Sequence, residues 1–233
     1  MCVTSTPGVR TASGGMTPTG TISSGSAMTQ LAANAMQSEH GLIGFSAPPP
    51  DGMENRDLID AGGGRIMSLQ GAAGFDSATS FALIRGGHVD MAVLGALQVD
   101  AAGRLASWMV PGKFTPGMGG AMDLVAGAKR VIIAMQHVAK SEPKIVETLT
   151  LPPTAARRVS LIVTELAVIE PTDEGLALRE RAPGVSVADI IASTGARLNV
   201  GDVTPEMPIE GESARLNDDS PQRLRAQALR NSQ

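Results

Sequence analysis

The sequence predicts an α/β fold in which helices flank an open, mostly parallel sheet. Short continuous apolar runs, above all residues 131–135, are typical of strands in parallel sheets that are covered on both faces. These runs alternate with short helical patterns, as expected of an α/β protein. The 27 glycines and 15 prolines among 233 residues indicate many tight turns between the elements.

The expected strands have continuous apolar residues or lie on both sides of a turn; they cover 65–69, 89–94, 96–99, 104–108, 131–135, 158–169 and 176–178. The expected helices or helical turns cover 27–36, 57–61, 75–85, 122–126 and 187–194. Asp76 or Ser77 can cap the helix over 75–85, and the following Gly-Gly pair ends it. Ser186 and Asp189 have the spacing of a capping box, with Asp in place of the usual Glu.

Composition divides the chain into three parts. Ser, Thr, Gly and Pro dominate the start, so residues 1–36 are expected to be a divergent or poorly ordered N-terminal segment. Residues 37–200 carry the α/β pattern and form the expected domain. The chain then becomes polar, and residues 201–233 are expected to form a tail.

Charge and composition exclude several classes of function. A net charge of −4, no basic run and 2% aromatic content argue against nucleic acid as a partner. Cys2 is the only cysteine, which leaves no intrachain disulfide or Cys-based metal site and suits a reducing cytoplasm. No apolar run approaches the roughly 18 residues of a membrane span, and the N-terminus has no signal-peptide core. A cytoplasmic protein is therefore expected.

Glu39 is the first candidate for chemistry. It is the first acidic residue of the chain and lies between Ser38 and His40, ahead of an apolar pair and Gly44. A Glu in such a setting is usually a turn residue. Residues 117–121, Gly-Met-Gly-Gly-Ala, are suited to presenting backbone N–H groups to a developing negative charge, although such a segment alone is most often a flexible loop.

Several segments together resemble one protein family. Residues 38–44, Ser-Glu-His-Gly-Leu-Ile-Gly, are similar to the Ser-Glu-Asn-Gly-apolar-apolar-Gly signature of family I CoA-transferases. Segments 75–77, 80–81, 84–90, 94–100, 108–113 and 117–124 resemble the same family in the same order. The similarity is to the B (beta) subunit of this family and extends from about residue 37 to residue 198. It is strongest to the 3-oxoacid branch, such as succinyl-CoA:acetoacetate transferases, and the 3-oxoadipate branch is close.

The resemblance implies the CoA-transferase fold and a ping-pong exchange of CoA between succinyl-CoA and a 3-oxo acid. Glu39 would be the nucleophile, first forming an acyl–glutamyl anhydride and then a glutamyl-CoA thioester. A carboxylate with an ordinary pKa of about 4.3 is already ionised near neutral pH, so it needs no general base. Gly120 and Ala121 correspond to the oxyanion residues, at a helix N-terminus whose dipole assists them.

The resemblance also implies binding residues and partners. The substrate- or CoA-binding candidates are Ser38, His40, Gly41, Gly95, Gln98, Lys113, Gly117 and Gly119. No metal and no bound cofactor are implied, because the coenzyme A thioester is the substrate. The expected partner is the separate A (alpha) subunit of a CoA-transferase, in an A2B2 heterotetramer that acts on acyl-CoA and small carboxylic acids.

Two departures from the family pattern leave alternatives open. His40 stands where the signature has Asn, and residues 1–36 show no counterpart of the helix, strand and Gly-Ile-Gly-Ile-Pro loop that precede the glutamate in the family. One alternative is an acyl-CoA hydrolase in which His40 assists a water molecule. The other is a catalytically impaired subunit that only assembles or binds ligand. Arg85 and His88 are expected to be structural residues, and His137 is assigned no role.

Overall fold

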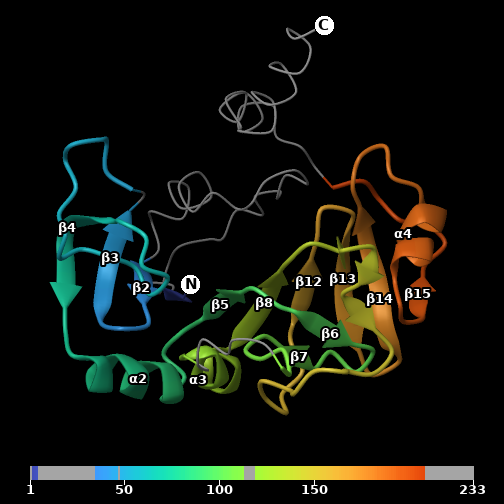
Figure 1. The fold of residues 1–233 in the computed structure, drawn as a ribbon, viewed down its shortest axis with the longest axis horizontal. Coiled ribbons are helices and arrows are strands. Elements are labelled where there is room, and N and C mark those ends of the chain that lie inside the picture. Colours follow the sequence, from blue (N-terminus) through green and yellow to red (C-terminus); the bar gives the residue numbers. More distant parts are fainter. Residues whose placement is uncertain (1, 5–34, 47, 113–118, 208–233) are drawn as a thin grey trace, which may run out of the picture.

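The computed structural model describes residues 2–4, 35–46, 48–112 and 119–207. Its main element is a ten-stranded sheet with the order β15-β14-β13-β12-β8-β5-β1-β2-β3-β4 (Figure 1). The strands are β1 (Cys2–Thr4), β2 (Ala35–Ser38), β3 (Leu42–Ser46), β4 (Met67–Gly74), β5 (Met91–Leu94), β8 (Arg130–Ala134), β12 (Leu161–Val163), β13 (Ala167–Thr172), β14 (Gly175–Arg181) and β15 (Leu198–Val200).

The α/β class is confirmed, and parallel strands form the centre of the sheet. β5 pairs in parallel with β8, and β8 with β12. β14 also pairs in parallel with β15. The remaining pairings, β12-β13-β14 and β5-β1-β2-β3-β4, are antiparallel, so the sheet is mixed rather than mostly parallel. The reason lies in the connections, because short turns such as 39–41 and 173–174 can join only antiparallel neighbours.

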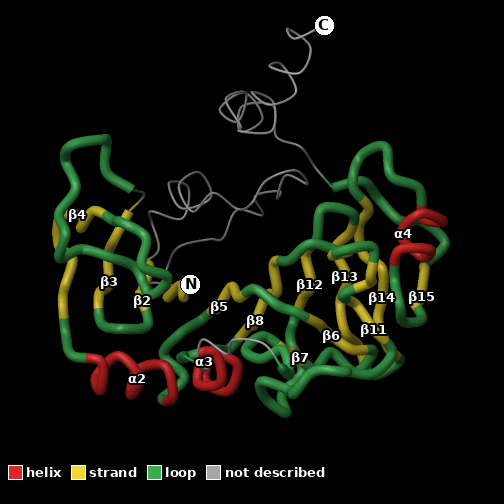
Figure 2. Tube along the Cα trace, in the orientation of Figure 1, coloured by secondary structure: helices red, strands yellow, loops and turns green. Residues whose placement is uncertain are grey.

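Three helices accompany the sheet in the described part of the chain: α2 (Ser77–Arg85), α3 (Ala121–Gly127) and α4 (Val187–Ser193). Asp76 caps α2 by accepting the Thr79 N–H, and Ser186 with Asp189 forms the predicted capping box of α4. α2 and α3 lie side by side below the sheet in Figure 2. None of the helices in the described ranges is long and apolar enough to cross a membrane.

Two smaller sheets pack beside the large one. β6 (Gln98–Asp100), β7 (Leu105–Ala106) and β11 (Ile145–Val146) form one, in the order β11-β6-β7, and β9 (Val138–Ala139) pairs with β10 (Glu142–Pro143). The strand, turn and return strand expected over 96–108 are therefore confirmed as the β6–β7 hairpin.

The hydrophobic core is divided unequally between the two ends of the molecule. The larger cluster lies around β5, β8 and β12–β14 and includes Ile84, Leu124 and Ile133, which are fully or almost fully buried. A smaller cluster of Met36, Phe45 and Ile66 supports the β2–β4 end. Because burying a large aliphatic side chain contributes about 1.5–3 kcal/mol, the larger cluster is the main source of stability.

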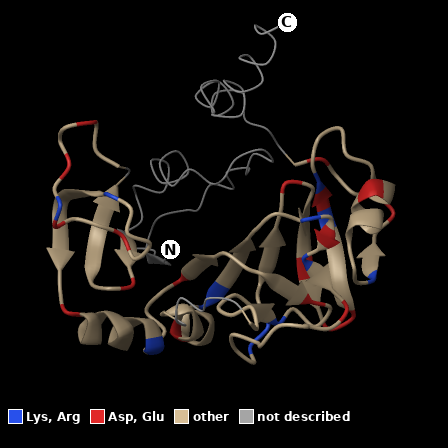
Figure 3. Cartoon of the chain, viewed as in Figure 1, with Lys and Arg blue, Asp and Glu red and all other residues tan. Residues whose placement is uncertain are grey.

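Acidic and basic residues are interspersed along β13 and β14 (Figure 3). Arg179 pairs with Glu170 across these strands at 2.6 Å, and Arg181 pairs with Glu206 at 2.7 Å. These partly exposed pairs contribute little to stability, since surface ion pairs are worth about 0–1 kcal/mol.

The structure corrects three expectations from the sequence. Cys2–Thr4 form β1 between β5 and β2, although the first 36 residues were expected to lack a strand. Ala35 and Met36 belong to β2 and not to a helix; the rest of the expected helix, 27–34, lies outside the described residues. Residues 57–61 form no helical turn, because the Asp60 carboxylate accepts the N–H groups of Gly62 and Gly64 and folds the chain into a loop instead.

Candidate active site

Glu39 lies in the tight turn between β2 and β3. The Gly41 N–H donates to the Ser38 carbonyl at 3.2 Å and closes the turn. Gly41 has a φ of +126°, and a Cβ at this position would lie 2.0 Å from the Phe75 carbonyl oxygen. Only glycine fits this backbone and this contact. The turn therefore fixes where the Glu39 side chain starts.

The chain on both sides of Glu39 is held firmly. Ser38 is buried, and its Oγ accepts the Leu42 N–H at 3.1 Å. The Gly41 carbonyl accepts the Phe75 N–H at 2.8 Å, which joins the turn to the segment leading into α2. Glu39 itself is half-buried, whereas the adjacent His40 is exposed.

The Glu39 carboxylate faces the start of α3. The Gly120 N–H donates to Glu39 Oε1 at 3.4 Å. A Cβ on Gly120 would lie 2.8 Å from Glu39 Oε2 and 3.0 Å from Cε1 of Phe81, so no larger residue fits there without displacing the carboxylate. A Cβ on Gly119 would be 3.9 Å from Oε1. The structure thus brings together Glu39, Gly119 and Gly120, although the glutamate and the two glycines are distant in the sequence.

A cavity of about 90 Å³ adjoins Glu39. Its walls come from the β2 residues Gln37 and Ser38, from Phe45 of β3 and from the 60–62 loop. A cavity of this size holds a few water molecules and is far too small for coenzyme A.

Two residues that the sequence did not single out contact the Glu39 region. Gln37 is fully buried, and its Nε2 donates to Ser80 Oγ of α2 at 2.9 Å. The ring of Phe81, the next residue of α2, lies at Gly120. The only sequence signal for Gln37 was its position two residues before the glutamate.

The remaining candidates are more dispersed. Gly95 lies in the exposed loop between β5 and β6, with open space where a side chain would point. Gln98 is in β6, and its amide is bonded to Thr150: Nε2 donates to Thr150 Oγ1 at 2.9 Å, and Oε1 accepts the Thr150 N–H at 3.1 Å. This side chain holds the loop at Thr150 to β6, and a binding role for Gln98 stays a prediction. Lys113 and Gly117 lie outside the described residues.

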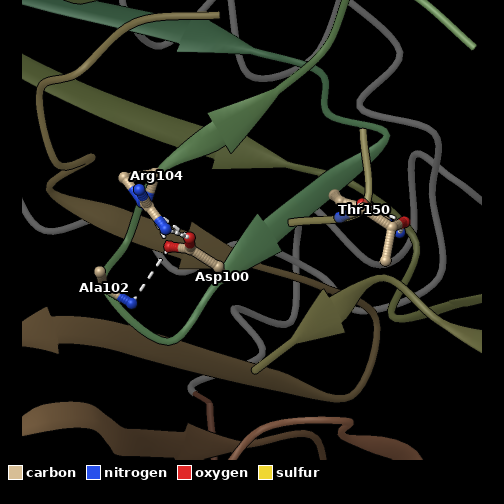
Figure 4. A network of polar contacts seen from close by, with 5 residues as sticks. Asp100, Ala102, Arg104 and Thr150 are labelled. Carbon is tan, nitrogen blue, oxygen red and sulfur yellow. Dashed lines mark hydrogen bonds and ion pairs between the residues drawn. The ribbon is translucent and has the colours of Figure 1, made fainter. Parts of the chain in front are cut away.

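Asp100 at the end of β6 is structural. It is fully buried, accepts the N–H groups of Ala102 and Arg104 and pairs with the Arg104 guanidinium at 2.7 Å (Figure 4). Figure 4 also shows Thr150 beside the same strand, at a distance from this turn. Asp100 therefore holds the turn between β6 and β7.

His137 is buried between two threonines. Its Nδ1 lies 2.9 Å from Thr164 Oγ1, and its Nε2 lies 2.8 Å from Thr194 Oγ1. Burial holds the pKa of His137 below its usual range, although the charge of Glu165 opposes this effect. Within the described ranges no group of three or more His, Cys, Asp or Glu residues could hold a metal ion.

The sequence pattern of the coenzyme A transferase family matches residues 12–193. The chain belongs to the coenzyme A transferase family. This coenzyme A transferase chain is 51% identical to the beta subunit of the acetate CoA-transferase of Haemophilus influenzae, over 78% of its own length and 81% of the relative. It is 47% identical to the B subunit of the probable succinyl-CoA:3-ketoacid coenzyme A transferase of Bacillus subtilis, over 69% of its own length and 75% of the relative.

The fold of the coenzyme A transferase chain also matches a solved structure. An acyl-CoA transferase apoenzyme from Escherichia coli O157:H7 superposes with a TM-score of 0.58 at 22% identity. The match covers 75% of this chain and 35% of the E. coli chain. This likeness concerns the fold, and the residue motifs around Glu39 come from the sequence.

Proposed function

We propose that the chain is the B (beta) subunit of a cytoplasmic 3-oxoacid CoA-transferase that works with a separate A subunit in an A2B2 complex. It would move CoA from succinyl-CoA to a 3-oxo acid, with Glu39 as the nucleophile. Relatives named as beta or B subunits of acetate and succinyl-CoA:3-ketoacid transferases support this assignment. The single observation that carries it is the Gly120 N–H donating to the Glu39 carboxylate.

In the first half-reaction, a Glu39 oxygen attacks the thioester carbon of the donor. A C–O bond forms, the C–S bond breaks, and the CoA thiolate leaves behind an acyl–glutamyl anhydride. Because the carboxylate attacks as an anion, no proton has to be removed from the nucleophile.

In the second step, the CoA thiolate attacks Cδ of Glu39. The new oxyanion then develops on the carbonyl oxygen of Glu39 itself, the donor acid leaves as its carboxylate, and glutamyl-CoA remains. The Gly120 N–H faces Oε1 at 3.4 Å, and the bond is expected to shorten as charge builds up on that oxygen. A donor of this kind typically lowers the barrier by about 2.7–4 kcal/mol.

The acceptor acid then reverses both steps. Its carboxylate attacks the glutamyl thioester, and the released thiolate attacks the acceptor acyl group to give the new acyl-CoA and free Glu39. The 90 Å³ cavity beside Glu39 is in keeping with a short acid chain. Binding the long CoA moiety away from the reacting carbon would supply most of the remaining stabilisation of the transition state.

The test is to incubate the full chain with succinyl-CoA in the presence of its A subunit, and then to measure the mass of the peptide that holds Glu39. A CoA-sized adduct is expected on this peptide, and Glu39→Gln should abolish it. No adduct with a competent A subunit would contradict the proposal. CoA release without any acceptor acid would instead indicate a hydrolase, and binding without either reaction would indicate an impaired subunit.

A further inference from the structure

We propose that Gln37 and Ser80 form a positioning pair that keeps the Glu39 carboxylate in front of the Gly120 N–H. The inference rests on the proposed function, because it assigns these two residues to the same site. Both residues are fully buried, and we infer that Gln37 acts through the strand end, although it also lines the cavity beside Glu39.

The orientation of the Gln37 amide follows from its partners. Nε2 donates to Ser80 Oγ at 2.9 Å and also lies 3.5 Å from the Ser80 carbonyl oxygen. A carbonyl can only accept a hydrogen bond, so the NH2 group and not the oxygen must face Ser80.

Ser80 passes this contact on to the residue before the glutamate. Its Oγ donates to the Ser38 carbonyl at 3.5 Å while accepting from Gln37. Gln37 and Ser38 are the last two residues of β2, so α2 holds the strand end from which Glu39 projects. A shift of this strand end would move the carboxylate directly.

The same helix also determines the position of Gly120. Phe81, next to Ser80, has its ring at Gly120, and Arg85 at the end of α2 pairs with Asp123 of α3 at 2.7 Å. The Arg85 guanidinium lies 5.5 Å from the centre of the Phe81 ring. α2 thus contacts both the strand that carries the nucleophile and the helix that begins at the donor, and it sets the distance between them.

The hydrogen bonding of Gln37 is poorly suited to a purely stabilising role. Its Oε1 is buried and finds no hydrogen-bond partner among the described residues. A buried acceptor without a partner is destabilising, so an apolar residue of similar length would make the fold equally or more stable. The destabilisation caused by the buried Oε1 is explained if the Gln37 amide is needed to orient the strand end.

The first test replaces Gln37 with Met, which has a similar length and no amide. In the complete complex with succinyl-CoA as donor, Gln37→Met is expected to lower kcat by about tenfold or more, because small displacements of reacting groups reduce rates strongly. KM for succinyl-CoA should stay within about twofold, and Tm should be unchanged or higher. A merely structural role predicts the opposite pattern, a lower Tm with an unchanged kcat for the folded protein.

Ser80→Ala provides the second variant and should lower kcat in the same way. The double variant should be no slower than the slower single variant, because the two side chains act as one unit. Ser160→Ala is the matched control: Ser160 Oγ likewise accepts one hydrogen bond, here from the Val131 backbone N–H at 3.1 Å, but it lies between β8 and β12. Unchanged kcat in both Gln37→Met and Ser80→Ala would overturn the inference.

A measurement that does not depend on activity separates this inference from the proposed function. In the ¹⁵N-labelled full chain, the Gly120 amide signal should shift when Glu39→Gln removes the carboxylate that this N–H faces. This response to Glu39→Gln should be weaker in the Gln37→Met and Ser80→Ala backgrounds. If the unaltered complex transfers no CoA, the proposed function fails, but a weakened response of the Gly120 signal still supports the positioning pair. An undiminished response in both variants contradicts the positioning pair.

Discussion

The backbone N–H of Gly120 lies 3.4 Å from Oε1 of Glu39, although 81 positions separate the two residues. Glu39 comes from the β2–β3 turn and Gly120 from the residue before α3. They meet because α2 packs against α3 and follows the β4 strand that pairs with β3. The candidate site is thus a product of how these elements pack.

Gly120→Ala tests whether this contact is required. The added Cβ would lie 2.8 Å from Oε2 of Glu39, so the carboxylate must move. Because Gly120 has a φ of −82°, alanine adds no backbone strain. We expect CoA-transfer activity to fall about 10²-fold with a small change in Tm, measured by steady-state kinetics of the complex and by thermal unfolding.

Gly201→Ala is the matched control for that substitution. Gly201 is exposed and has only one atom, the Val203 carbonyl oxygen at 3.9 Å, near the added Cβ. Its activity should equal that of the unaltered complex. If the Gly120→Ala enzyme stays fully active, the close contact between Glu39 and Gly120 is not required for CoA transfer.

Gly41→Ala should destabilise the fold through the turn that carries Glu39. Both the φ of +126° and the 2.0 Å approach of the Phe75 carbonyl oppose a side chain. Gly184→Ala separates the two causes, because Gly184 has a φ of +76° with open space around it. We expect Gly184→Ala to cost about 1–2 kcal/mol and Gly41→Ala about 2 kcal/mol more. Urea unfolding measures both; equal losses would show that the Phe75 contact relaxes freely.

His40→Asn tests the departure from the family signature. His40 is exposed, and the described residues give its side chain no hydrogen-bond partner. Surface substitutions of this kind usually change free energies by less than about 0.5 kcal/mol. We therefore expect kcat of the complex to change by no more than about twofold. A large gain of activity in His40→Asn would instead favour the alternative of a catalytically impaired subunit.

His137 should make the protein less stable in mild acid. Its pKa is lowered in the fold, mainly by burial, so the unfolded chain takes up a proton at higher pH than the native chain does. The stabilisation is present above the unfolded pKa of about 6.5 and is lost as pH falls below it, by at most about 1.4 kcal/mol per pH unit. The measurement is the free energy of unfolding in urea at about pH 7.5 and about pH 5.5, on either side of that pKa.

His137→Gln is the comparison for that measurement, since glutamine keeps a polar group between Thr164 and Thr194 but does not titrate. Its stability should fall less between the two pH values than that of the unaltered chain, and the comparison also cancels the contribution of the exposed His40 and His88. Equal pH dependence in both proteins would mean that the His137 pKa is not lowered.

Local structure followed from the sequence where the signal lay within a few residues. Asp76 and the Gly86-Gly87 pair fixed the ends of α2, and Ser186 with Asp189 fixed the start of α4. In both cases the side chain that caps the helix lies within three positions of the N–H it accepts. The β6–β7 hairpin was equally accessible, because Asp100 turns the chain with contacts to residues 102 and 104.

Expectations went wrong where partners lie far apart in the chain. Nothing local indicates that Cys2–Thr4 pairs with both β2 and β5, because these strands begin far along the chain, at Ala35 and Met91. Nothing local shows either that the amide of Gln98 is hydrogen-bonded to Thr150, 52 positions away. The antiparallel flanks of the sheet depended in the same way on which strands became neighbours.

The sequence by itself determined the α/β class, the family and the identity of Glu39 as the candidate nucleophile, because these depend on residue types in a fixed local order. Only the tertiary structure decided that Gly120 faces that carboxylate and that Gln37 and Ser80 support it. Those relationships join residues 43 and 81 positions apart, and packing alone determines their distances.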